Sequence, residues 1–247
     1  MMAGVAIVTG GGSGIGAASA RALVDAGWSV AVIGRRRAAL DRICADIGGS
    51  MLAIEADVTN EAAVVDAFDA AIAKFGRIDL LFNNAGAMMR PTGIADVPLD
   101  QWRALIDVNV TGAFLCAREA FRRMAAQSPQ GGRIINNGSI SAHVPRPRAV
   151  AYTVSKHAIT GLTRALSLEG RACNVACGQI DIGNAVSEMS AGIAAGSMQA
   201  DGQVRPEPTM AVDNVARSVV HMASLPLDAN VQFMTVLATA MPYIGRG

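Results

Sequence analysis

The chain has 247 residues, of which 51% are hydrophobic, and its 21 basic and 20 acidic residues leave a formal charge of +1. This length fits one α/β domain with a large core, and the near-neutral charge argues against binding of nucleic acid or another polyanion. The four cysteines lack CxxC spacing, which argues against a zinc site or a disulfide framework.

Apolar segments typical of buried strands alternate along the chain with segments of helical periodicity. The expected strands are VAIV (5–8), WSVAVI (28–33), MLAIEA (51–56), IDLLFN (78–83), RIINN (133–137), ACNVAC (172–177) and VQFMTVLA (231–238). The expected helices cover 17–26, 37–47, 61–75, 99–126, 149–170 and 213–224. Strands that are apolar throughout are buried on both faces, as in a parallel sheet. The fold class is therefore α/β: one Rossmann-type, doubly wound domain over 1–247, with about seven parallel strands and helices on both faces.

Residues 183–209 are rich in Gly, Ala, Ser and Met and contain Pro206 and Pro208. This composition predicts a substrate lid within the domain, with a helical piece around 186–195. No stretch approaches the roughly 20 uninterrupted apolar residues that cross a bilayer, and the first 35 residues lack the pattern of a signal peptide. We expect a cytoplasmic protein with reduced thiols and no membrane partner.

The segment TGGGSGIG (9–16) lies between the first expected strand and the first expected helix. It fits GxGxxG in no register. Glycines at such a turn nevertheless let the backbone approach a pyrophosphate, whose charge then lies at the positive end of the helix. We interpret Gly10, Gly14 and Gly16 as part of a nucleotide-binding loop. The alternative is a flexible turn with Ser13 as the helix cap.

Arg35, Arg36 and Arg37 follow the second expected strand. Dinucleotide folds of this kind carry an acidic residue here that binds a ribose 2′-OH, and this chain has none. Arg35 and Arg36 suit a 2′-phosphate, which accepts planar, charge-assisted hydrogen bonds. This predicts NADP(H) as cofactor, with NAD(H) as the alternative. For each arginine a solvated side chain at a helix start is the other reading, and for Arg37 it is the one we favour.

Tyr152 and Lys156 in YTVSK (152–156) lie one turn apart on the same face of an expected helix. An ammonium beside a phenol stabilises the phenolate, which suits the pair to general acid and base catalysis. Ser139 follows the strand at 133–137 at the carboxyl edge of the sheet, where open α/β sheets bind ligands. Its hydroxyl is placed to polarise a carbonyl. The alternative for YTVSK is an amphipathic helix with a surface lysine.

With these motifs in this order, the chain resembles the short-chain dehydrogenase/reductase family. The matching pieces are TGGGSGIG (9–16), ADV (56–58), NNAG (83–86), Asn109 in DVNVTGAF, Ser139 and YTVSK. The resemblance implies a catalytic tetrad. Tyr152 transfers the proton, and Lys156 stabilises its phenolate and holds the nicotinamide ribose. Ser139 orients the carbonyl, and Asn109 keeps a water in the proton relay.

The resemblance also implies which residues contact the cofactor, and it implies no metal. The predicted cofactor contacts are Gly10, Ser13, Gly14, Ile15, Gly16, Arg35, Arg36, Asp57, Val58, Asn83, Ala85, Gly86, Tyr152, Lys156, Gly178 and Ile180. The alternative for Asn83 and its neighbour Asn84 is that they satisfy backbone groups between strands.

The expected function is NADPH-dependent reduction of a carbonyl to an alcohol, or the reverse, by a 3-oxoacyl-type or broad-specificity ketone reductase. The alternative is a non-catalytic NADP(H)-binding sensor or scaffold. The resemblance implies a homotetramer. The candidate substrate-pocket residues are Met88, Met89, Arg90, His143, Arg146, Arg148, Met189 and Ile193. The three arginines indicate an anionic or polar substrate, and the alternative is that they are solvated loop side chains.

Two positions in CGQIDIGNA (177–185) depart from the family pattern, because Cys177 replaces the expected proline and Ile182 the expected threonine. The nicotinamide carboxamide is then expected to be held by backbone groups or by Asn184. We interpret Cys177 as a small buried hydrophobic residue rather than a redox-sensitive thiol.

Overall fold

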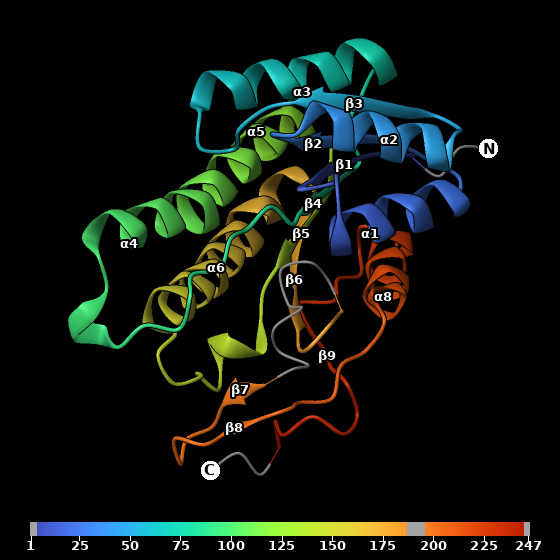
Figure 1. The fold of residues 1–247 in the computed structure, drawn as a ribbon. Helices are drawn as coiled ribbons and strands as arrows, with labels where there is room; N and C mark the ends of the chain where they lie inside the picture. The colour runs from blue at the N-terminus through green and yellow to red at the C-terminus, as the bar shows by residue number, and fades with distance from the viewer. Residues whose placement is uncertain (1–3, 187–195, 245–247) are drawn as a thin grey trace.

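The computed structural model describes residues 4–186 and 196–244. Within them, seven parallel strands form one sheet in the order β3-β2-β1-β4-β5-β6-β9 (Figure 1). The strands are β1 Gly4–Thr9, β2 Trp28–Gly34, β3 Met51–Glu55, β4 Leu80–Asn83, β5 Gly132–Asn137, β6 Val175–Ile182 and β9 Phe233–Val236. A separate antiparallel pair, β7 Ser197–Met198 and β8 Val204–Arg205, follows β6. The α/β fold class and the number of sheet strands are confirmed.

Helices cover both faces of the sheet (Figure 1). One face carries α1 Gly14–Asp25, α2 Arg37–Ile47 and α8 Val212–Ser224, and the other carries α3 Glu61–Phe75, α5 Ala113–Ala126 and α6 Val150–Glu169. Helix α4 Leu99–Ile106 continues into α5 through a π-helical stretch, Asp107–Gly112. In β2, Val30 and Val32 pack on the α1 side and Ala31 and Ile33 on the α3 side. Burial on both faces explains why the strand sequences are apolar throughout.

The prediction of a strand over 172–177 is wrong at both ends. Gly170–Cys173 form a 3-10 helix, and Asn174 adopts the left-handed conformation with φ of 57°. Extended pairing with β5 begins only after this residue, so β6 starts at Val175 and runs on to Ile182. Residues 187–195, which hold nearly all of the helical piece expected around 186–195, lie outside the described residues.

The strand order reverses at β1, which has β2 on one side and β4 on the other. In open α/β sheets, ligands bind beyond the carboxyl ends of the strands at such a reversal. The loops after β1, β4, β5 and β6 all leave the sheet at this edge, because the strands are parallel. The fold therefore brings TGGGSGIG, NNAG and Ser139 to one place.

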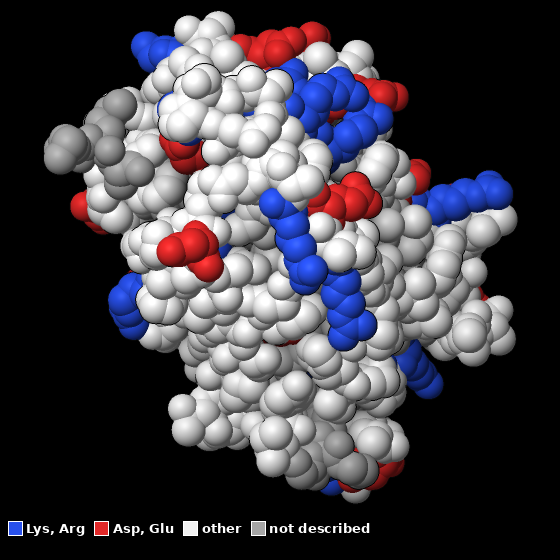
Figure 2. All heavy atoms as spheres, turned by 180° about the vertical axis from the view of Figure 1, so that it is seen from behind, with Lys and Arg blue, Asp and Glu red and all other residues white. Residues whose placement is uncertain are grey.

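Charged side chains of both signs lie interspersed on the face seen in Figure 2, and most of that face is uncharged. No helix in the described ranges is both long and apolar enough to cross a membrane. The same residues contain no group of three or more His, Cys, Asp or Glu side chains placed to hold a metal ion.

Candidate active site

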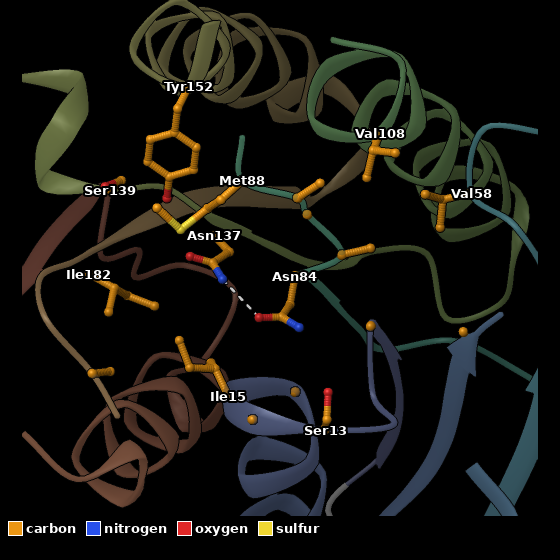
Figure 3. A pocket seen from close by; sticks show the side chains of 18 of the residues that line it. Ser13, Ile15, Val58, Asn84, Met88, Val108, Asn137, Ser139, Tyr152 and Ile182 are labelled. Carbon is orange, nitrogen blue, oxygen red and sulfur yellow. Dashed lines mark hydrogen bonds between the residues drawn. The ribbon is translucent and has the colours of Figure 1, made fainter. Parts of the chain in front are cut away.

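A cavity of about 580 Å³ lies at the carboxyl edge of the sheet. Its walls come from the loops after β1, β2, β3, β4, β5 and β6 and from the first turns of α6 (Figure 3). This volume falls within the range of sites for small molecules and cofactors. Most of the residues predicted for catalysis and cofactor binding line it.

The glycine loop forms the part of the wall at the start of α1. Gly10, Ser13, Gly14, Ile15 and Gly16 all line the cavity, and Figure 3 shows Ser13 and Ile15 at the end of the helix that faces it. A Cβ atom at Gly16 would lie 2.2 Å from the main-chain oxygen of Gly10, so no side chain fits between the loop and the helix. Ser13 occupies the N-cap position, but its hydroxyl makes no capping bond and instead accepts from Arg36 Nη2 at 3.4 Å. The positive end of α1 therefore faces the cavity, as an anion site requires.

The structure separates Arg37 from the other two arginines of the cluster. Arg35 and Arg36 line the cavity, whereas Arg37 does not. Arg37 is exposed and donates through Nε to Asp41 one turn along α2, at 2.8 Å. This confirms Arg37 as a solvated side chain at the helix start.

Asp57 and Val58, in the loop after β3, line the same end of the cavity. The main-chain N–H and the hydroxyl of Thr59 donate to Asp57 Oδ1, at 3.0 and 2.9 Å. The pKa of Asp57 lies below its ordinary value, mainly because of that main-chain N–H. Burial opposes the change, and the Thr59 hydroxyl and the charge of Arg35 add to it. Asp57 is therefore a charged carboxylate at neutral pH.

The two asparagines of NNAG differ in position. Asn83 is buried and does not line the cavity, so its prediction as a cofactor contact is corrected. Its amide donates to the main-chain oxygen of Ala113 and to Asn136 Oδ1, so it holds strands and helix together. Asn84 lines the cavity together with Ala85 and Gly86. The main-chain N–H groups of Asn84 and Ala85 both donate to Thr9 Oγ1 at 2.9 Å, which joins the ends of β1 and β4.

The hydroxyl of Tyr152 points from α6 into the cavity, whose wall also includes Ser139 (Figure 3). Ser139 Oγ accepts from the main-chain N–H of Ser141 at 3.1 Å. Within the described residues, neither the proton of the Ser139 hydroxyl nor the Tyr152 hydroxyl has a hydrogen-bond partner. Both groups are thus free to bind an oxygen atom in the cavity.

Lys156 lies next to Tyr152 and is fixed by the end of β5. Its Nζ donates to the main-chain oxygen of Asn137 at 2.8 Å and lies 5.5 Å from the centre of the Tyr152 ring. The Asn137 side chain donates to Asn84 Oδ1 at 2.8 Å, the dashed line in Figure 3. From the sequence, Asn137 was expected only as the end of a strand. The polar pair that closes the apolar run RIINN was the signal for its role.

Asn109 lies in the π-helical stretch, is 3% exposed and does not line the cavity. Its Oδ1 accepts from the main-chain N–H of Ala87 at 2.7 Å, and its Nδ2 donates to the Ala87 oxygen and to Ser155 Oγ. Ser155 Oγ in turn donates to the main-chain oxygen of Tyr152 at 2.8 Å. Asn109 therefore ties the turn that carries Tyr152 to the loop after β4, and its part in a water relay stays a prediction.

Asp181 is a further buried group beside Ser139 that the sequence analysis missed. It accepts from the main-chain N–H of Ser139 and lies 2.9 Å from His143 Nε2. His143 does not line the cavity. A carboxylate in a mainly apolar strand was the available signal, because buried charges are rare without partners.

Gly178 and Ile180, predicted to contact the cofactor, lie in the middle of β6 and away from the cavity. A Cβ atom at Gly178 would lie 2.2 Å from the main-chain oxygen of Val231, and Ile180 is fully buried in the core. The prediction is corrected for both, because β6 runs on to Ile182 and the cavity begins only at its end. The residues that line the cavity there are Ile182, Gly183, Asn184 and Ala185.

The other candidates are also separated by the structure. Met88 and Arg146 line the cavity, whereas Met89, Arg90 and Arg148 do not. Met189 and Ile193 lie outside the described residues.

The structure shows what surrounds the segment CGQIDIGNA (177–185), which departs from the family pattern. The Asn184 amide is occupied by Arg146, Glu207 and Pro208, which leaves backbone groups as the expected partners of a carboxamide. Cys177 is fully buried, and burial raises the pKa of its thiol to about 12, so its interpretation as a buried side chain is confirmed.

Comparisons with known proteins agree with this geometry. The family model described as short chain dehydrogenase matches residues 4–197. The uncharacterized oxidoreductase YohF of Escherichia coli K12 is 40% identical over 68% of this chain and 67% of its own length. Sulfoacetaldehyde reductase 2 of Chromohalobacter salexigens is 30% identical over 96% of this chain and 95% of its own. The crystal structure of a 3-ketoacyl-(acyl-carrier-protein) reductase from Brucella melitensis, complexed with NADH, superposes with a TM-score of 0.87 at 25% identity, covering 97% of this chain and 98% of that one.

Proposed function

The chain belongs to the short-chain dehydrogenase/reductase family, and we propose that it is an NADP(H)-dependent enzyme that interconverts a carbonyl and an alcohol. One observation carries the proposal. The hydroxyls of Ser139 and Tyr152 belong to the same cavity, beside the Lys156 ammonium, and neither hydroxyl proton has an acceptor within the described residues. A sensor or scaffold that only binds the cofactor has no use for this arrangement.

The residues of the cavity fit a nicotinamide dinucleotide. The start of α1, with no side chain at Gly16, suits the pyrophosphate. Arg35 and Arg36 suit a 2′-phosphate at the adenosine end, and Asp57 and Val58 lie where they would flank the adenine. The Brucella relative is complexed with NADH, so our preference for NADP(H) rests on the two arginines alone. When bound, the nicotinamide supplies or accepts the hydride.

The protein's own groups handle the proton. In the direction of reduction, Ser139 donates its hydroxyl proton in a hydrogen bond to the substrate carbonyl oxygen, because a carbonyl oxygen can only accept and the N–H of Ser141 leaves this proton free. Tyr152 transfers its hydroxyl proton to the same oxygen as the alcohol forms. Lys156, held by the Asn137 oxygen, stabilises the phenolate that remains. In the direction of oxidation these steps reverse.

The substrate is a small carbonyl compound or alcohol, and the relatives' names cover a wide range of these, from a 3-ketoacyl thioester to sulfoacetaldehyde. The test is turnover with a panel of ketones, aldehydes, 3-oxoacyl thioesters and sugars, with NADPH and with NADH. We expect cofactor oxidation with at least one class and faster turnover with NADPH. Binding of NADPH without turnover of any member would contradict the proposal.

We also propose that the chain forms a homotetramer through α5, α6 and β9. Each of these elements exposes a large apolar side chain: Phe114 at 46%, Leu168 at 63% and Phe233 at 39%. An interface through these three elements would remove these apolar side chains from water. Light scattering on the purified protein tests this, and a monomer would contradict it.

A further inference from the structure

The substrate end of the cavity contains a basic side chain that the proposed mechanism does not use. Four basic residues line the cavity within the described ranges: Arg35, Arg36, Arg146 and Lys156. The first two lie at the adenosine end, and Lys156 belongs to the proton-transfer group. Arg146 lies in the loop between β5 and α6, six residues before Tyr152, and has no role yet.

Arg146 is held by segments that lie far from it in the sequence. Its Nη2 donates to Asn184 Oδ1 at 2.8 Å and to Glu207 Oε2 at 2.6 Å. Asn184 also donates to Glu207 Oε2, and Gln199 Nε2 donates to Glu207 Oε1 at 2.9 Å. The Glu207 side chain is 1% exposed. The loop after β6 and the segment around β7 and β8 therefore fix one side of the guanidinium.

The rest of the guanidinium is not satisfied. Nη1 of Arg146 is buried and has no hydrogen-bond partner among residues 4–186 and 196–244, so its two N–H groups lack an acceptor there. Both Glu207 oxygens are already occupied by other donors, including Nη2 itself. A buried donor that lacks an acceptor costs free energy, which an incoming acceptor would recover. A structural tie between loops needs only Nη2, so it does not account for the rest of the group.

We propose that Arg146 binds a carboxylate of the substrate, so that the enzyme acts on oxo acids or the corresponding hydroxy acids. This inference rests on the proposed function. Both N–H groups of Nη2 already donate, so the carboxylate is bound through Nη1, whose N–H groups donate charge-assisted hydrogen bonds to it. Glu207 and Asn184 hold the guanidinium in the cavity that Ser139 and Tyr152 also line. Arg146 is thus a residue that determines specificity, and Glu207 is a positioning residue.

The test compares acids with their neutral esters. The probes are pyruvate, acetoacetate and levulinate and the methyl ester of each, assayed with NADPH. For at least one pair we expect kcat/KM to be about tenfold to a hundredfold higher for the acid, the effect of one charge-assisted hydrogen-bonded pair. Arg146→Lys keeps the charge beside Glu207 but removes Nη1. It should lower kcat/KM for the acid at least tenfold more than for the ester, mainly through KM.

Controls separate binding from folding. Arg148→Gln removes a nearby arginine that does not line the cavity, and the acid preference should persist. Arg146→Gln combined with Glu207→Gln removes both charges, leaves no unpaired buried carboxylate, and should abolish the preference. Equal kcat/KM for acid and ester in the wild type, or an equal loss for both in Arg146→Lys, would overturn the inference.

A binding measurement decides the matter independently of turnover. Calorimetric titration of each acid and ester into the protein with NADP⁺ should show at least tenfold tighter binding of one acid by the wild type, and no such difference in Arg146→Lys. Equal affinities, or no binding of any probe, overturn the assignment of Arg146. Absence of turnover across the whole carbonyl panel contradicts the proposed function instead.

Discussion

The main-chain N–H of Ser139 donates to the carboxylate of Asp181 across 3.0 Å. Asp181 belongs to the neighbouring strand β6, and its side chain is 1% exposed. The same carboxylate oxygen accepts from Gln179 Nε2 at 2.7 Å, while the other lies 2.9 Å from His143 Nε2. Gly138 makes room for it, because a Cβ atom there would lie 2.1 Å from Asp181 Oδ1. A buried carboxylate thus fixes the backbone of the serine that we place against the substrate.

Replacing Asp181 tests this relationship. Asp181→Ala leaves the Ser139 N–H and one of the two N–H groups of the Gln179 amide without an acceptor, because the other donates to Thr160. Each orphaned donor costs about 1–3 kcal/mol. Asp181→Asn keeps an oxygen for these donors and offers an amide to His143. We expect the alanine variant to unfold at lower urea and to lose kcat at least tenfold, with the asparagine variant closer to the wild type. Equal kcat in all three proteins would show that Ser139 does not depend on this contact.

The cofactor preference should follow the division within the arginine cluster. Arg35→Gln and Arg36→Gln each remove a side chain that lines the cavity, so the Kd for NADPH should rise about tenfold to a hundredfold while that for NADH changes little. Arg37→Gln is the matched control, because Arg37 pairs with Asp41 outside the cavity. Fluorescence titration of the reduced cofactors measures these constants. If the variants bind NADH and NADPH more weakly by the same factor, Arg35 and Arg36 do not bind a 2′-phosphate.

Glu207 should make stability depend on acid pH. Burial raises its pKa, but hydrogen bonds from Gln199 and Asn184 and the charge of Arg146 outweigh burial and hold the pKa below its ordinary value. The folded state therefore binds this proton less tightly than the unfolded state. The stabilisation is complete above the unfolded pKa of about 4.3 and is lost as the pH falls through the lower folded value.

Glu207→Gln removes that titration. Its deficit in the free energy of unfolding, about 1–3 kcal/mol at pH 7, should be constant down to about pH 5 and shrink below about pH 4.3. Urea unfolding of both proteins between pH 7 and pH 3.5 measures the difference. If the difference in the free energy of unfolding between the two proteins stays unchanged over this pH range, Glu207 does not form a stabilising ion pair with Arg146.

Two cysteines should resist alkylation in the folded protein. Burial raises the pKa of Cys116 and of Cys177 to about 12, so only about 10⁻⁴ of either thiol is ionised at pH 8. Cys44 and Cys173 are partly exposed. Mass spectrometry after brief treatment with iodoacetamide at pH 8 should find label on these two alone, and on all four after unfolding. Rapid labelling of Cys177 in the folded protein would contradict this expectation and support a redox-sensitive thiol.

The sheet was predictable because its strands are buried on both faces and are therefore apolar throughout. Periodicity also placed Arg37 at the first position of α2, which separates it from Arg35 and Arg36. The start of β6 was not predictable, because the apolar run ACNVAC continues through Asn174 while the backbone there turns left-handed. Composition does not carry that information.

The contacts that complete the site depend on register. Asn137 pairs with Ile180 across β5 and β6, and this offset brings Asp181 beside Ser139. The sequence predicts that both strands exist and that both end at the same edge, but not how one is shifted along the other. Arg146, Asn184 and Glu207 are likewise brought together by loops rather than by any periodic pattern. Motifs with fixed spacing, such as YTVSK, were the part of the site that the sequence supplied.

The central claim is that Tyr152 transfers the proton in a nicotinamide-dependent reaction. Its most direct test is Tyr152→Phe, which removes one oxygen atom and keeps the ring beside Lys156. With NADPH and a carbonyl substrate, we expect the variant to bind NADPH within about threefold of the wild type while kcat falls about 10²- to 10⁴-fold, the usual contribution of a general acid. Unchanged kcat in Tyr152→Phe, or a wild type that binds no nicotinamide cofactor, would contradict the account.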